Sequence, residues 1–170
     1  MDIMIKFDKQ KAHEIILYFA NRCKVHDFYN ILKYLYLADK LHLEKYGRFI
    51  SSDFHVAMDW GPVPSTTYNI IKNVRDGKDN SFDFKINRHK VNPLRDANSD
   101  FLSESDIECM DIIISKYGNC GFKKIHDESI DDAYNKHHKK GTSKRIPLED
   151  IIKTLPNSNE LLEYINVNYG

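Results

Sequence analysis

A group of histidine and acidic residues lies between positions 126 and 138. Its members are His126, Asp127, Glu128, Asp131, Asp132, His137 and His138. Imidazole and carboxylate groups together suit zinc, manganese or iron. However, no spacing here matches a signature such as His-Glu-x-x-His, and a charged surface sequence with eight histidines forms such groups by chance. We therefore expect no metal and no cofactor, and we expect His126 to hold a helix junction through hydrogen bonds.

Nucleophilic catalysis is not indicated either. The chain has no Gly-x-Ser-x-Gly elbow, no phosphate-binding glycine loop and no Cys-His arrangement. Asp39 and Lys40 are adjacent on a predicted helix, so their side chains point in different directions. If Asp39 is buried it needs a partner, and we expect a structural ion pair with Arg48, just after Gly47. These residues predict a chain that is not an enzyme, and a metal-dependent hydrolase is the least favoured interpretation.

The composition limits where the protein acts. Lys plus Arg equals Asp plus Glu at 25 each, so no overall charge attracts nucleic acid or membranes. The longest apolar run, Ile15 to Ala20, is far too short to span a membrane, and the N-terminus does not resemble a secretory signal. Three cysteines without a Cys-x-x-Cys pair indicate reduced thiols. The sequence predicts a cytoplasmic protein that binds no membrane.

Helical periodicity dominates the first third of the chain. Asp8 can cap a first helix, whose apolar residues form one stripe beside a solvent-exposed face: Ala12, Ile15, Ile16, Phe19, Ala20 and Cys23. Asp27 can cap a second helix, which runs to Tyr46 and stops at Gly47. This helix is apolar on all sides between residues 34 and 38, so we expect it to be the central one.

The remaining elements predict an α+β fold that is predominantly helical. Residues 53–59 alternate as a half-buried strand with Phe54, Val56 and Met58 inward, and the prolines of 60–64 form a turn into a third helix that ends near 76–77. Residues 82–86 and 90–94 resemble a β-hairpin, and helices follow at 103–117, 122–127, 147–155 and 159–167. We predict one domain over 1–170 with a C-terminal helical extension at 146–168. A single antiparallel sheet should combine 53–58, 82–86 and 90–94, and the predicted core residues are Leu35, Ala38, Phe54, Val56, Ile71 and Phe84.

The order helix, strand, helix, hairpin over residues 28–94 is that of a winged helix. A DNA reader needs cations for the phosphates and a helix for the major groove. Basic residues do occur in this segment, with Arg88-His89-Lys90 at the hairpin tip, but the candidate recognition helix from Ser65 to Lys72 carries little positive charge. A DNA-binding transcriptional regulator is therefore our alternative prediction, and nucleic acid is the less favoured partner.

Residues 34–68 carry a resemblance to a known family. An apolar helix, a glycine, a short strand and a Gly-Pro-Val turn resemble the Panacea (SocA-like) antitoxin domain, with matches at Leu35, Tyr36, Ala38, Asp39, Lys40, Gly47, Gly61, Pro62, Val63 and Tyr68. A weaker match lies at 125–128 and 132–134, where isoleucine replaces threonine and tyrosine replaces tryptophan. The resemblance spans roughly residues 10–138.

The resemblance implies a mostly helical bacterial or phage domain that neutralises a cognate toxin by direct contact. In one branch of the family the antitoxin also delivers the toxin to a protease. Tyrosine and tryptophan are favoured anchors at protein interfaces. We therefore expect a toxin-binding surface at Tyr36, Lys40, Trp60, Pro62, Ser65 and Tyr68. Structural roles are expected for Asp39, Gly47, Arg48, Gly61 and His126.

Overall fold

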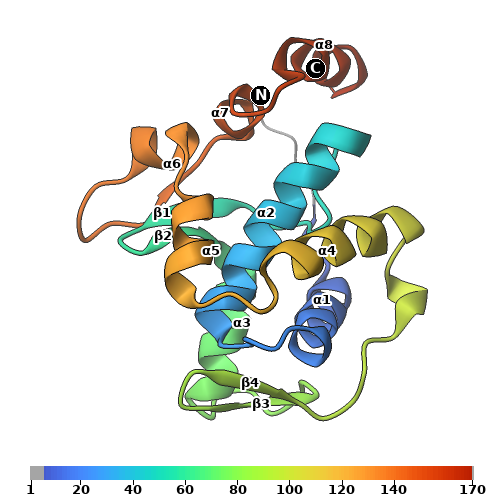
Figure 1. The fold of residues 1–170 in the computed structure, drawn as a ribbon, viewed down its shortest axis with the longest axis vertical. Coiled ribbons are helices and arrows are strands. Elements are labelled where there is room, and N and C mark those ends of the chain that lie inside the picture. Colours follow the sequence, from blue (N-terminus) through green and yellow to red (C-terminus); the bar gives the residue numbers. More distant parts are fainter. Residues whose placement is uncertain (1–5, 170) are drawn as a thin grey trace.

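Helix α2 (Phe28–Tyr46) runs through the middle of the computed structural model, which describes residues 6–169 (Figure 1). Leu35 and Ala38 are buried on it, as expected of a helix covered on all sides. The helix ends at Gly47, whose positive φ of 79° forms a left-handed cap. The prediction that this helix is the central one is confirmed.

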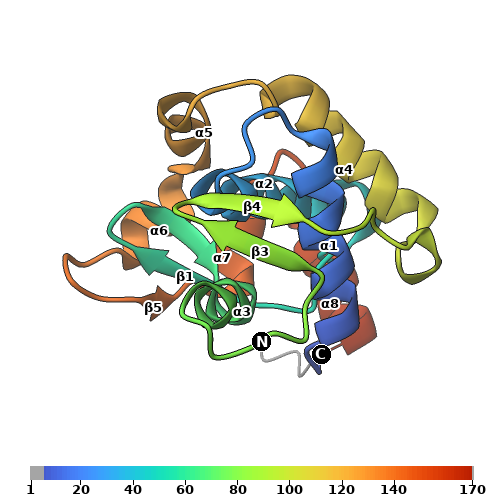
Figure 2. The same ribbon diagram turned by 90° about the horizontal axis from the view of Figure 1, so that it is seen from below.

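Helix α1 (Lys9–Arg22) is capped by Asp8, which accepts a hydrogen bond from the Lys11 amide. The predicted solvent-exposed face is wrong, because every residue from Ala12 to Ala20 is buried. Helix α1 lies between helix α4 (Glu104–Tyr117) on one side and the strands β3 (Phe84–Asn87) and β4 (Lys90–Pro93) on another (Figure 2). These elements cover the face of α1 that was predicted to be exposed to solvent. The polar residues His13 and Glu14 are buried there with partners.

The strands form two separate sheets, so the predicted single sheet is wrong. β1 (His55–Met58) lies between β2 (Gly61–Pro64) and β5 (Lys144–Arg145) in an antiparallel sheet. β3 and β4 pair with each other in a second sheet, and Lys90 of β4 also forms an isolated bridge with Asp27. β2 occupies the segment predicted to be a turn. The two prolines hold the preceding residues extended, and a strand that lacks these N–H donors fits a sheet edge.

The inward face of β1 also differs from the prediction. Val56 is buried as expected, but so are Asp53 and His55, whereas Phe54 is 38% exposed. Asp53 turns inward because it caps helix α3 (Ser65–Arg75), accepting hydrogen bonds from the amides of Thr66 and Thr67. Phe54 consequently points outward, beneath the guanidinium of Arg145. Of the predicted core residues, Phe54 is wrong and the others are buried: Leu35, Ala38, Val56, Ile71 and Phe84.

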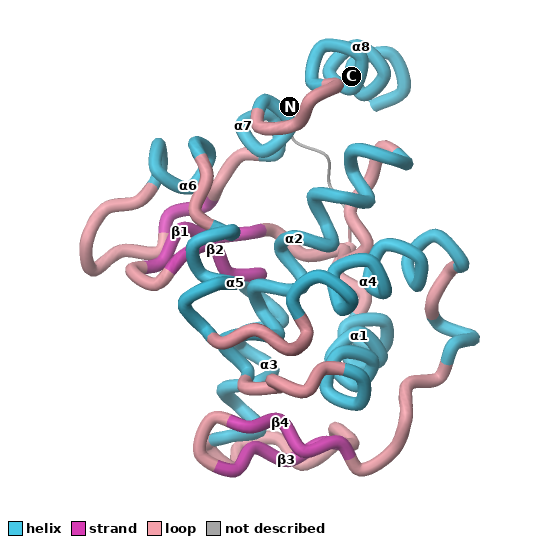
Figure 3. Tube along the Cα trace, in the orientation of Figure 1, coloured by secondary structure: helices cyan, strands magenta, loops and turns pink. Residues whose placement is uncertain are grey.

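After the β3–β4 hairpin the chain is mainly helical, with loops and the short strand β5 between the helices (Figure 3). A 3-10 turn, η1 (Ser99–Phe101), precedes α4, which begins with a capping box between Ser103 and Asp106. The helices α5, α6, α7 and α8 follow at Phe122–Ser129, Asp132–His137, Leu148–Lys153 and Ser158–Tyr169. The fold is therefore α+β and mostly helical, as predicted. No helix within residues 6–169 is long and apolar enough to cross a membrane.

A second apolar cluster joins the last two helices to the rest of the molecule. Ile151, Ile152 and Ile165 pack there with Tyr36 of α2 and Ala57 of β1. Figure 1 shows α7 and α8 beyond the C-terminal end of α2. The three cysteines are free thiols, with Cys23 and Cys109 buried, as the absence of a cysteine pair motif predicts.

Candidate functional site

Three exposed aromatic side chains line one hollow in the surface. Trp60 is 68% exposed, Tyr29 37% and Phe122 36%, and together they line a space of about 320 Å³. An inner pocket of about 110 Å³ lies beneath them, lined also by Leu32, Lys33, Met58, Val63 and Tyr68. We call the whole hollow the aromatic groove. Large exposed aromatic residues gathered in one place are typical of a binding site.

Trp60 is presented by a turn that is held from below. The turn Asp59-Trp60 joins β1 to β2, with Met58 opposite Gly61. The hydroxyl of Tyr134 donates to the Met58 carbonyl oxygen at 2.6 Å. The Asp59 carboxylate accepts from the Gly141 amide at 2.9 Å and pairs with the ring of His138 at 3.0 Å. These contacts fix the backbone that carries Trp60, so little conformational freedom remains to be lost on binding.

The other walls of the groove come from three helices. Tyr29, on α2, packs against Phe28 at a ring distance of 4.2 Å and meets the edge of Phe122, at the start of α5, at 6.3 Å. Tyr68, on α3, lies under the ammonium of Lys72 at 4.7 Å. Since Asp53 caps α3, that carboxylate also positions Tyr68.

Lys33 forms part of the floor of the inner pocket. Its side chain is almost completely buried, and its ammonium donates a hydrogen bond to the Pro62 carbonyl oxygen at 2.8 Å. Burial lowers the pKa of Lys33 to about 7, because the charged form loses its hydration. A Cβ atom on Gly61 would lie 2.8 Å from this ammonium, and the φ of Gly61 is +115°. Glycine is therefore required at this position for two reasons.

The predicted contact residues divide between the groove and the interior. Trp60 and Tyr68 line the groove, and Ser65 is half-buried in the first turn of α3. Tyr36 and Pro62 are buried. Lys40 is paired with Asp131 at 2.8 Å, and the same carboxylate accepts from the Tyr36 hydroxyl. Tyr36 and Lys40 therefore join α2 to the segment before α6 and do not line the groove.

The predicted ion pair between Asp39 and Arg48 is wrong. Asp39 is fully buried and accepts hydrogen bonds from the amide and hydroxyl of Ser51, at 2.9 and 2.6 Å, and its carboxylate is 2.8 Å from the His55 ring. Arg48 instead reaches Asp106 on α4 at 3.2 Å. After Gly47 reverses the chain, the returning segment 50–55 brings Ser51 and His55 to Asp39, which leaves Arg48 facing α4.

His126 holds its helix junction through the main chain rather than through the imidazole. Its carbonyl oxygen accepts from the Ser129 hydroxyl at 2.7 Å and from the Ile130 amide at 3.2 Å. The imidazole is 3.4 Å from the neighbouring Asp127 carboxylate. Across residues 6–169, no three histidine, cysteine or acidic side chains are grouped as a metal site would require.

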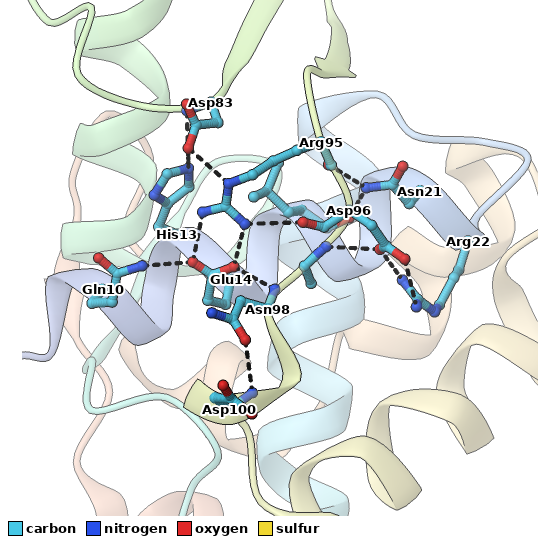
Figure 4. A network of polar contacts seen from close by, with 12 residues as sticks. Gln10, His13, Glu14, Asn21, Arg22, Asp83, Arg95, Asp96, Asn98 and Asp100 are labelled. Atoms are coloured by element: carbon cyan, nitrogen blue, oxygen red, sulfur yellow. Dashed lines mark hydrogen bonds and ion pairs between the residues drawn. The ribbon is translucent and has the colours of Figure 1, made fainter.

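A second polar network ties α1 to the β3–β4 hairpin (Figure 4). Arg95 donates to both oxygens of the buried Glu14, at 2.7 and 2.8 Å, and to Asp83 at 2.8 Å. Hydrogen bonding to Arg95 lowers the pKa of Glu14 to about 2. His13 accepts from the Asp83 amide at 2.9 Å, and burial lowers the pKa of His13. Because the buried polar groups of this network are hydrogen-bonded to one another, we assign it a structural role.

The backbone of the hairpin tip is bonded to the start of α2, while the side chains of residues 87–90 are exposed. The His89 carbonyl oxygen accepts from the Phe28 amide at 2.8 Å, and the His89 ring lies 5.4 Å from that of Tyr29. On α3, Arg75 pairs with Asp76 and Lys72 lies over Tyr68. The side chains of Arg88 and Lys90 remain exposed at the tip, so a DNA-binding regulator stays the alternative prediction.

Sequence reasoning missed six groove residues: Tyr29, Leu32, Lys33, Met58, Val63 and Phe122. Lys33 carries a signal that could have been used, because it stands alone in the otherwise apolar run from Ile31 to Ala38. Tyr29 and Phe122 are about ninety positions apart in sequence, and periodicity does not predict that α2 and α5 lie side by side.

Comparison with known proteins places these elements in a family. Searches of curated proteins and of solved structures gave no match. A family model described as "Antitoxin SocA-like, Panacea domain" matches residues 31–135, from the first turn of α2 into α6. The matched segment contains most of the groove and the Tyr36, Lys40 and Asp131 cluster. The chain therefore belongs to the SocA-like Panacea antitoxin domain family.

Proposed function

We propose that this protein is an antitoxin that neutralises a cognate protein toxin by direct contact, with the aromatic groove as the binding surface. The observation that carries the proposal is Trp60, which is 68% exposed on a turn held by Tyr134 and His138. A rigid aromatic side chain loses little entropy on binding and is a typical interface anchor.

The other predicted contact residues support this surface in different ways. Tyr68 lines the groove together with Trp60, and Ser65 is half-buried in the first turn of the same helix as Tyr68. Pro62 holds the strand that follows Trp60, and its carbonyl oxygen accepts from Lys33. Tyr36 and Lys40 act from beneath, because their bonds to Asp131 fix the segment that leads to Tyr134.

A gene next to this one that encodes a small toxin-like protein would identify the partner to test. Co-expression with that protein should restore growth, and Trp60→Ala should weaken binding by roughly thirtyfold or more, because an anchor contributes about 2 kcal/mol. Leu94→Ala is the matched control, since Leu94 is 59% exposed and does not line the groove. Normal neutralisation by a folded Trp60→Ala variant would contradict the proposed surface.

Toxin abundance separates the two routes of neutralisation. An antitoxin that blocks its toxin leaves the toxin level unchanged, whereas one that delivers it to a protease lowers that level. An immunoblot of the co-expressed toxin, with and without the antitoxin, distinguishes these outcomes. We expect unchanged abundance, because contact through the groove accounts for neutralisation without a second partner.

A further inference from the structure

Lys33 stands apart from the other buried charged side chains in the described structure. Glu14 pairs with Arg95, Asp106 with Lys11, and Asp150 with His137. Asp39 lies against His55, and Asp53 accepts from the first amides of α3. Within residues 6–169, Lys33 has no carboxylate partner, and its one hydrogen bond goes to a carbonyl oxygen. A buried cation without a counter-charge destabilises a fold, so an apolar residue would serve packing better here.

The position of Lys33 connects this cation to the surface. It lines the inner pocket together with Leu32, Met58, Val63 and Tyr68, beneath the exposed ring of Trp60. None of the lining residues is acidic. The pocket therefore combines apolar walls with a single basic group, the Lys33 amine, which is complementary to a ligand with an apolar body and a negative end.

The dimensions of the pocket restrict what can enter it. Its volume of about 110 Å³ is smaller than the roughly 150 Å³ cavity that holds one benzene molecule, so it admits a single side chain and not a segment of backbone. The wider space over Tyr29, Trp60 and Phe122, about 320 Å³, has room for a neighbouring side chain.

We propose that the aromatic groove recognises an acidic side chain of the protein partner. A glutamate or aspartate of the toxin enters the inner pocket and pairs with Lys33, while an adjacent apolar side chain packs against Trp60 and Phe122. This inference rests on the proposed function and specifies the chemistry of the partner. The carboxylate of the toxin would then be the counter-charge of Lys33, present only in the complex.

The properties of Lys33 agree with this role. Its pKa of about 7 reflects the loss of hydration, and a carboxylate in the same apolar pocket would favour the charged form again. Gly61 keeps the ammonium in place, because a side chain at that position would occupy the space beside it. Gly61, which leaves this space free, directly follows Trp60, the proposed anchor for the partner.

Selection from a display library of random peptides tests the inference without knowledge of the toxin. The full-length protein should enrich peptides with an acidic residue next to an apolar one. Lys33→Met should lose the acidic preference while keeping the apolar one, and Trp60→Ala should lose the enrichment altogether. Lys116→Met is the control for the loss of one positive charge, since Lys116 is exposed on α4 and lies outside the groove.

A pair of synthetic peptides gives a second measurement that needs no variant protein. An enriched peptide and its Glu→Gln or Asp→Asn counterpart should differ in affinity for the wild-type protein by about tenfold or more. Equal affinities, or a wild-type selection without an acidic position, would overturn the inference. If Lys33→Met is folded and keeps the acidic preference, it is equally overturned. Each of these three outcomes overturns only the preference for an acidic side chain. The proposed function would still be supported if Trp60→Ala lost toxin neutralisation.

Discussion

The hydroxyl of Tyr36 donates a 2.6 Å hydrogen bond to Asp131, 95 positions further along the chain. The same carboxylate accepts from Lys40 at 2.8 Å and from the Tyr134 amide at 2.8 Å, where it caps α6. Asp131 thereby joins the first family motif on α2 to the second motif beside α6. The Tyr134 hydroxyl then continues the chain of contacts to the turn that presents Trp60.

Asp131→Ala should therefore destabilise the protein by about 2–4 kcal/mol. The variant leaves the buried hydroxyl of Tyr36 and the Lys40 ammonium without an acceptor and removes the cap of α6. Urea denaturation monitored by circular dichroism would measure the loss. Asp132→Ala is the matched control, because Asp132 is exposed in the first turn of the same helix and should change stability by no more than about 0.5 kcal/mol.

Arg95→Ala should cost about 3 kcal/mol, because it leaves the buried carboxylate of Glu14 without its charged partner. Arg75→Ala is the control, since Arg75 is similarly exposed and its ion pair is with the exposed neighbour Asp76, not with a buried carboxylate. The pKa of Glu14 is lowered to about 2, so its pairing stabilises the fold above pH 4.5 and is lost as the pH falls from 4.5 towards 2. The difference between wild type and Arg95→Ala should shrink over that window. A constant difference would show that Glu14 is not the group that titrates.

Lys33 should also make stability increase with pH, but in a higher pH range than Glu14. Its folded pKa of about 7 lies below the unfolded value of 10.5, so the unfolded chain binds the extra proton between these values and stability increases with pH. Lys33→Met should remove this increase. Urea titrations of both proteins at pH 7 and pH 9.5 would show it as a smaller pH effect in the variant. The same slope in both proteins would mean that Lys33 keeps its proton in the folded state.

The sequence predicted the helices well because their signals are local. Asp8, Gly47 and the capping box at Ser103 lie within a few residues of the ends that they define. The strand partners were not predicted, since β1 pairs with β5, nearly ninety positions away, and periodicity contains no information on such pairings. The prediction for Phe54 failed for a related reason: Asp53 turns inward to cap α3, which leaves Phe54 exposed, and only the folded chain shows that contact.

The aromatic groove was predicted in part. Trp60 and Tyr68 belong to the segment that carries the family motif, and their residue types indicate an interface. Tyr36 has the same residue type but is buried, because the hydroxyl finds a carboxylate that is distant in sequence. Phe122 is exposed, although it lies in the first turn of a helix that buries another apolar residue, Ile125. Residue type alone does not distinguish an anchor from a core side chain; the surrounding contacts do.

Gly61→Ala tests whether the Lys33 ammonium needs the space that the missing side chain of Gly61 leaves free. At a φ of +115° an alanine costs about 1–3 kcal/mol of backbone strain. The new Cβ would also displace the Lys33 ammonium from the Pro62 carbonyl oxygen, and loss of that hydrogen bond adds about 1 kcal/mol.

A double-mutant cycle separates these two contributions. In a Lys33→Ala background, only the backbone strain remains, so Gly61→Ala should cost about 1 kcal/mol less there than in the wild type. Gly77→Ala provides the reference for strain alone, because Gly77 has a φ of +72° and no neighbouring atom within 4 Å of its Cβ position. Its cost should be the same in both backgrounds. If Gly61→Ala also costs the same in both, the Lys33 side chain moves aside freely, and the close approach of these two residues does not constrain the floor of the groove.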